Sequence, residues 1–206
     1  MSTKKAPCTN TALIILEKSI PLFAKSGFTG VSMRDIAKTV GISIAALYHH
    51  YPDKQSMYIA AMGHAFSDMS TSIHSSLEIK GSAEERLSNF ITSFTQQMAD
   101  SPDFRALLQR ELLDGDDERL KLLATKVFVE PFKALIDLAH DLYLDCDAHL
   151  LAISMTGLIL FHFQTAPIRQ FLPGGRPEHD APEIIARHVL MLVSGVFNNV
   201  QQEAEY

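Results

Sequence analysis

Residues 32–54, which read SMRDIAKTVGISIAALYHHYPDK, constrain the fold of this chain more than any other segment. Ser32 and Asp35 have the S-x-x-D spacing of a capping box, which predicts that a short helix begins here. Gly41 is where that helix should end, because glycine adopts the left-handed conformation of a turn at the lowest cost. Ser43 is the predicted cap of a second short helix. Two short helices joined by a tight glycine turn are typical of a helix-turn-helix, which presents its second helix to a DNA major groove.

The rest of the chain also has helical periodicity, and no convincing period-2 strand pattern appears. The first predicted helix carries an apolar stripe of Leu13, Leu16, Ile20 and Phe23. Pro131 lies inside a later helical pattern and predicts a kink there. The chain is therefore predicted to be all-α, with nine helices, three in a small head and six in a body. Outside residues 32–54, the expected helices cover residues 10–26, a long stretch from 53 to before 81, 83–99, about 102–113, 118–143, 148–171 and 183–201.

Charge is divided unevenly along the chain. The net charge is −6, yet residues 1–55 carry seven basic and three acidic side chains. A basic head on an acidic body fits contact with nucleic acid at one end of the molecule. The charge pattern supports the helix-turn-helix interpretation but would not establish it alone.

Several classes of protein are disfavoured. The sequence contains no serine nucleophile motif, no phosphate-binding glycine loop and no paired-carboxylate signature, so we expect neither an enzyme nor a cofactor. The His, Asp and Cys residues between positions 140 and 149 match no zinc or calcium spacing, so no metal is expected. With two cysteines, Cys8 and Cys146, and no signal-like start, a cytoplasmic location is expected. Residues 148–168 are free of Asp, Glu, Lys and Arg, and we expect a helix buried within the protein or between subunits rather than a membrane span.

A family resemblance rests on motifs spread between Leu13 and Tyr58. These are Phe23, Gly27 and Phe28, then Ile36-Ala37, Gly41 and the run from Leu47 to Lys54, LYHHYPDK. In this order they resemble the TetR family of bacterial transcriptional regulators. The resemblance implies a helix-turn-helix DNA-binding domain at residues 1–53 and a helical ligand-binding and dimerisation domain at residues 54–206. It also implies a homodimer formed through the last two helices, about residues 148–171 and 183–201.

The function implied by the resemblance is transcriptional repression. Such a protein binds a palindromic double-stranded DNA operator and leaves it when a small, largely apolar effector binds. An activator or a ligand-independent regulator remains an alternative. A third alternative is a small-molecule-binding protein whose head no longer reads DNA, which only the apolar run Ile44-Ala45-Ala46 favours.

The expected DNA-facing residues lie on the two short helices and at the start of the next. Tyr48 and Lys54 match the family's phosphate-binding positions, while Ile44 and its two alanine neighbours suit thymine methyl groups. Two roles are open for Ser32 and Ser43, capping alone or capping together with a phosphate contact. Two are also open for Arg34, contact with DNA or exposure to solvent. The full set is Ser32, Arg34, Ser43, Ile44, Ala45, Ala46, Tyr48, His49 and Lys54.

The resemblance also implies an effector pocket in the body, and an abundance of Met and Phe suits an adaptable apolar site. Each of these side chains, taken singly, also fits a plain core. His162 could orient a polar group of the ligand or be satisfied by Gln164 or across a dimer interface. Glu111 is expected to be exposed to solvent rather than to face a ligand. The predicted pocket residues are Phe90, Phe94, Met98, Phe104, Leu108, Phe128, Phe132, Met155, Ile159, His162 and Phe163.

Overall fold

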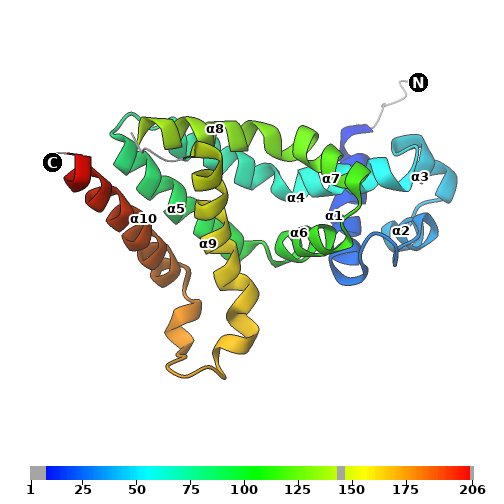
Figure 1. The fold of residues 1–206 in the computed structure, drawn as a ribbon. Helices are drawn as coiled ribbons and strands as arrows, with labels where there is room; N and C mark the ends of the chain where they lie inside the picture. The colour runs from blue at the N-terminus through cyan, green and yellow to red at the C-terminus, as the bar shows by residue number, and fades with distance from the viewer. Residues whose placement is uncertain (1–7, 143–146, 205–206) are drawn as a thin grey trace, which may run out of the picture. The chain divides into compact units, whose positions relative to one another are not determined.

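The computed structural model describes residues 8–142 and 147–204, and side chains within residues 11–142 and 147–195. The described residues form helices and no strand, which confirms the all-α prediction (Figure 1). Cys146 and the predicted helix end at Tyr143 lie outside the described residues. The elements are α1 (Cys8–Ser26), α2 (Met33–Val40), α3 (Ile44–His50), α4 (Lys54–Leu77), α5 (Ala83–Asp100), α6 (Pro102–Asp114), α7 (Asp117–Leu123), the π-helical η1 (Ala124–Phe128), α8 (Val129–Asp141), α9 (Ala148–Arg169), the 3₁₀-helical η2 (Pro177–Asp180) and α10 (Pro182–Ala204).

The helix predicted over residues 118–143 is continuous in its described part, because α7, η1 and α8 follow one another without a break. A π-helical turn at residues 124–128 precedes Pro131, the position at which the sequence predicts a kink. Proline has no backbone N–H, and its ring clashes with the carbonyl four residues earlier, which here belongs to Val127. A π-helical turn at that carbonyl accommodates the proline within a continuous helix.

Contacts divide the chain into two compact units, and the first comprises residues 1–67 and 102–128. Within its described part, α1 packs against α2 and α6, and α2 packs against α3. The buried Tyr58 ring meets Phe23 and Phe28 edge-on, with ring centroids 4.9 and 5.3 Å apart. Arg110 of α6 donates hydrogen bonds to the carbonyls of Ala24 and Lys25 at the end of α1, at 2.9 and 2.8 Å. These contacts hold the helix-turn-helix and α6 together in one unit.

The predicted stripe on α1 is partly wrong. Leu13 is 43% exposed, and the buried face instead contains Ile15, Leu16, Ser19 and Phe23. Because α1 packs against both α2 and α6, its buried face is wider than a single stripe. Ser19 is accommodated there because its hydroxyl donates to the Leu16 carbonyl at 2.9 Å.

The second unit comprises residues 68–101 and 129–206, and in its described part α5 packs against α8, α9 and α10. Helix α5 begins at a capping box, in which Ser82 accepts from the Glu85 amide and Glu85 accepts from the Ser82 amide. The apolar face of α5 is buried, as are its partners on α9 and α10. This core includes Leu87, Phe90, Ile91, Phe94, Met98, Ala152, Met155, Ile159, Ile185, Val189 and Val193.

The two compact units do not follow the predicted functional boundary at residue 53. Residues 54–67 of α4 belong to the first unit, and residues 68–77 belong to the second. Along α4 the apolar face is buried in both parts, at Tyr58, Met62, Phe66, Met69 and Ile73. The division of roles between residues 1–53 and 54–206 remains a prediction.

Candidate nucleic-acid interface

The geometry of α2 follows from its two ends. The Asp35 amide donates to Ser32 Oγ at 3.2 Å, and the Ser32 amide donates to Asp35 Oδ2 at 3.0 Å. The hydrogen bonds from Ser32 hold the pKa of the Asp35 carboxyl below its ordinary value. At the other end Gly41 has φ of 85°, and its amide donates to the Ala37 carbonyl at 2.9 Å. The predicted capping box and left-handed turn are both confirmed.

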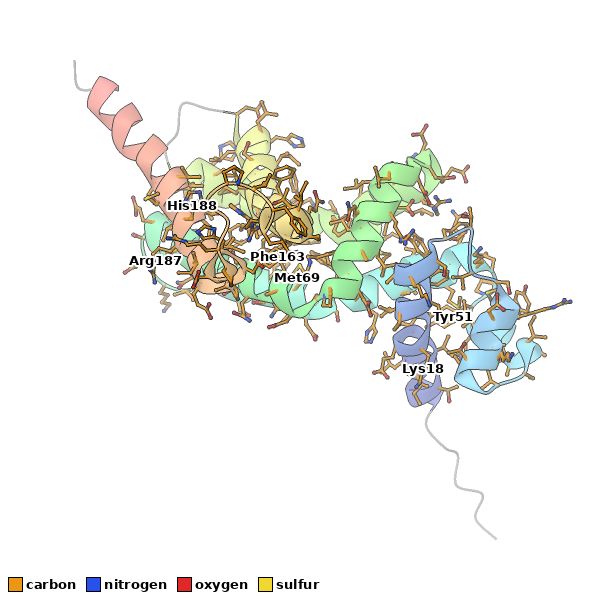
Figure 2. The ribbon with its side chains drawn as sticks, turned by 90° about the horizontal axis from the view of Figure 1, so that it is seen from below. Lys18, Tyr51, Met69, Phe163, Arg187 and His188 are labelled. Atoms are coloured by element: carbon orange, nitrogen blue, oxygen red, sulfur yellow. The ribbon has the colours of Figure 1, made fainter. Side chains whose placement is uncertain are left out.

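Helix α3 is anchored by few contacts. Ser43 Oγ accepts from the Ala46 amide at 3.1 Å, which confirms the predicted cap. Leu47 is fully buried at 0% exposure and fixes the rotation of the helix. Just after the helix, the Tyr51 hydroxyl donates to the Ala12 carbonyl of α1 at 3.2 Å, so Tyr51 packs against the first helix (Figure 2).

The face of α3 opposite Leu47 is open. Tyr48 is 48% exposed and Ile44 39%, while Ser43, Ala45 and His49 are also exposed. The small and apolar residues at the start of the helix leave room for another molecule's backbone or base edges to approach closely. This arrangement can receive a double helix without disturbing the core.

The remaining predicted DNA-facing residues surround this face within the first unit. Ser32 and Arg34 are exposed on α2, and Ala46 is half-buried. Lys54 is also half-buried, and its ammonium lies 4.4 Å from the centroid of the Phe28 ring. Burial and the nearby Arg119 guanidinium lower the pKa of Lys54. Lys54 is therefore held in place by an aromatic ring rather than by a carboxylate.

Glu111 is the clearest error of the sequence interpretation. It is 1% exposed rather than solvated, and Arg119 Nε donates to its Oε1 at 2.9 Å. The same guanidinium lies 3.3 Å from Asp116 Oδ2 and 4.4 Å from the Phe28 centroid. Desolvation, followed by the neighbouring Glu111, raises the pKa of Tyr58. The partners are eight residues apart across a turn, a separation for which helical spacing within one element gives no signal.

The predicted pocket residues fall into both units. Phe104, Leu108 and Phe128 belong to the first, where the Phe66 ring stacks on Phe104 at 5.2 Å and meets Phe128 edge-on at 5.1 Å. The others belong to the second unit, where Phe90 stacks on Phe94 at 5.4 Å. The eight residues in the second unit are Phe90, Phe94, Met98, Phe132, Met155, Ile159, His162 and Phe163.

The aromatic partner of His162 comes from α10. Its ring centroid lies 5.7 Å from that of His188, whereas Gln164 is exposed. Figure 2 shows His188 on α10 and Phe163 on α9. Burial, followed by Arg169 and His188, lowers the pKa of His162. His162 therefore connects the last two long helices.

The sequence interpretation missed a groove of about 490 Å³ in the first unit. Its lining comes from the start of α4 and from the α7–η1 segment, so only the fold brings these residues together. Of the predicted site residues, only Lys54 takes part. The lining residues are Asp53, Lys54, Gln55, Ser56, Ile59, Leu122 and Lys126.

Helices α9 and α10 expose large apolar side chains. Phe161 is 64% exposed and Met191 63%. Within the described residues, α9 is the one helix long and apolar enough to cross a membrane by length and composition, with 17% of its most apolar window buried. The exposed apolar residues of the two helices are Leu150, Ile153, Leu158, Phe161, Ile168, Ile184, Met191 and Leu192.

Comparisons with known proteins agree with this geometry. Residues 15–61 match the model of the bacterial regulatory proteins, tetR family. The biofilm operon icaADBC HTH-type negative transcriptional regulator IcaR of Staphylococcus epidermidis is 36% identical over 53 residues, 26% of this chain and 29% of that protein. The nucleoid occlusion factor SlmA of a Marinomonas species is 27% identical over 114 residues, 55% of this chain and 58% of that protein. The matches thus span less than two thirds of these relatives' lengths.

A solved structure shows the same fold over most of the chain. It is the crystal structure of AibR in complex with isovaleryl coenzyme A and operator DNA. The two chains are 20% identical and superpose with a TM-score of 0.64, covering 88% of this chain and 97% of that one.

Proposed function

The chain belongs to the TetR family of bacterial transcriptional regulators, and from this premise we propose that it is a homodimeric repressor released from a palindromic operator by a small, largely apolar effector. The observation that carries the proposal is the capped α3 helix, which buries Leu47 and leaves Tyr48 and its neighbours exposed. A helix fixed on one side and open on the other is what major-groove reading requires.

Most of the DNA affinity would come from phosphate contacts. Tyr48 and Lys54 would bind backbone phosphates, with the exposed Ser32, Arg34 and Ser43 beside them. Ile44, Ala45 and Ala46 offer no hydrogen-bond donor to a base, so their part would be apolar contact with thymine methyl groups. His49 would donate to a phosphate or a base edge. Specificity would then depend partly on DNA shape.

The dimer would form through α9 and α10. Their exposed apolar residues include two pairs on α9 that are three residues apart, Leu150 with Ile153 and Leu158 with Phe161, and on α10 Ile184 and Met191, which are seven residues apart. Such a face is costly to leave in water, and a second copy would cover it in a four-helix arrangement. Two copies would present two α3 helices to successive major grooves, about 34 Å apart on a palindromic site.

The effector site would lie in the apolar interior of the second unit. Met98 and Met155 are fully buried there with Phe90, and methionine adapts readily to a bound molecule. AibR has been crystallised with both an acyl coenzyme A and operator DNA, which supports a ligand-responsive role by analogy. To release DNA, the effector must bind the DNA-free state more tightly than the DNA-bound state.

A polarisation titration tests the DNA-binding part of the proposal. The full chain is titrated with DNA from upstream of its own gene, with competitor DNA and at two salt concentrations. Binding should resist competitor, and Tyr48→Phe and Lys54→Ala should each weaken it. Lys54→Ala, which removes a positive charge, should also lower its dependence on salt. Lys121→Ala, which removes an exposed charge on α7, serves as the matched control. If both variants kept the wild-type affinity and salt dependence, the phosphate assignments would be wrong.

A further inference from the structure

The groove of about 490 Å³ in the first unit is lined by two lysines from distant parts of the sequence. Lys54 begins α4, whereas Lys126 belongs to the π-helical turn η1. The π turn that accommodates Pro131 therefore supplies a lysine to a groove that begins at a predicted DNA-facing residue. No sequence motif connects the two positions.

Neither lysine ammonium is neutralised by a carboxylate of the described residues. In the described part of the chain, no carboxylate oxygen is within ion-pair distance of Lys54 or Lys126. The groove does contain one carboxylate, that of Asp53, but its Oδ1 accepts the Ser56 amide at 2.6 Å as the cap of α4. Lys54 also lies close enough to the Arg119 guanidinium for the two positive charges to interact unfavourably. The groove therefore has an excess of positive charge that an anion would relieve.

The other lining residues suit a phosphate group. Gln55 and Ser56 carry side-chain donors, while Ile59 and Leu122 form an apolar part of the wall. Donors beside apolar surface bind an anion more strongly than donors in open water, because the local dielectric constant is lower.

We propose that this groove is a second phosphate-binding site for the DNA backbone, in which Lys126 holds a phosphate together with Lys54. The inference rests on the proposed function, since Lys54 brings the backbone to the groove. It extends the DNA-binding surface beyond the helix-turn-helix to a residue of the α7–η1 segment. Lys126 then adds affinity for any sequence rather than discrimination between bases.

The test is the salt dependence of operator affinity for Lys126→Ala, with Lys121→Ala as the matched control. Both lysines are exposed and five residues apart, but only Lys126 lines the groove. One lost phosphate contact should reduce the slope of log affinity against log salt by about 1. A fourfold rise in salt should then cost Lys126→Ala about fourfold less affinity than it costs the wild type. Lys126→Arg should restore most of the slope.

Three results would overturn the inference. In the first, Lys126→Ala and Lys121→Ala have the same slope as the wild type, while Lys54→Ala has a lower one. The proposed function would then stand, but the groove would not be a phosphate site. In the second, pyrophosphate binds the wild type but not Lys126→Ala, and the DNA slopes are equal, so the groove holds a free phosphate compound. In the third, the wild type itself shows no competitor-resistant DNA binding, and the proposed function fails as well.

Discussion

The helix pairs α2–α3 and α9–α10 differ in how far each is specified by interactions close by in the sequence. Helices α2 and α3 have 8 and 7 residues, and side-chain caps and a left-handed glycine fix their ends. Helices α9 and α10 have 22 and 23 residues, and each leaves large apolar side chains uncovered. The short pair is specified by interactions within a few residues, whereas the long pair has an apolar face that the described residues do not cover. Local rules thus specify the first pair, but they do not specify what covers the apolar face of the second.

The largest effect on stability should come from breaking the buried Arg119–Glu111 ion pair of the first unit. Arg119→Met leaves Glu111 buried without its partner, which should lower the free energy of unfolding by about 3–5 kcal/mol. Arg86→Met removes an ion pair with the half-exposed Asp141, and it should cost less than about 1 kcal/mol. Urea unfolding of both variants measures the difference. Equal losses would mean that the interior of the first unit does not depend on this pair.

A smaller effect is expected from placing charge on the exposed face of the long pair. Phe161→Glu would put two carboxylates into a self-complementary interface, and like charges there should weaken the dimer by about a hundredfold. Ile79→Glu is the matched control, because Ile79 is an exposed apolar residue outside α9 and α10. Sedimentation equilibrium measures the dimer dissociation constant of each variant. If Phe161→Glu left the dimer unaffected, or if the wild type formed no dimer, a second copy would not explain the exposed apolar face of α9 and α10.

The capping boxes of α2 and α5 use the same interactions, so the effects of removing each can be compared directly. Ser32→Ala and Ser82→Ala each remove a capping box, and each should lower the free energy of unfolding by about 1 kcal/mol. Only Ser32→Ala should also weaken DNA binding, since Ser82 begins a helix of the second unit. Thermal unfolding and operator titration of the two variants separate the roles. Equal DNA affinities would show that Ser32 is a cap alone.

The smallest effect concerns pH. The pKa of His162 in the folded protein lies below its ordinary value of 6.5, so folding disfavours its protonated form. Its contribution to stability is complete above pH 6.5 and is lost as the pH falls through the lower pKa. Stability between pH 7 and 5 should therefore fall less steeply in His162→Gln than in the wild type. Parallel curves would show that the contact with His188 and Arg169 has no such consequence.

Local patterns predicted the helix-turn-helix because its determinants lie within a few residues of one another. The Ser32–Asp35 box, the Gly41 turn and the Ser43 cap are all confirmed. Glu111 was placed wrongly because its partner Arg119 approaches only after a turn reverses the chain. The groove at Lys126 was missed because a π-helical turn and the start of α4 meet only in the fold. Local residue patterns therefore predict helix caps well, but they predict contacts between distant residues poorly.

The sequence did not specify which apolar residues share a cavity. Phe90, Phe104 and Phe128 all have the composition and spacing of interior residues, yet the last two belong to a different compact unit from the first. Helical periodicity predicts which face of a helix is buried, but not which other helix buries it. The effector pocket therefore remains a prediction.

The central claim is that α3 reads DNA, and footprinting on the DNA upstream of its gene tests it most directly. The full chain should protect two half-sites centred about 34 Å apart along one face of the duplex. Ala45→Glu places a carboxylate on the exposed face of α3 and should abolish this protection. Gln109→Glu makes the same change of charge at an exposed position of α6 and should leave it intact. Protection that survives Ala45→Glu, or that never forms with the wild type, would contradict the account.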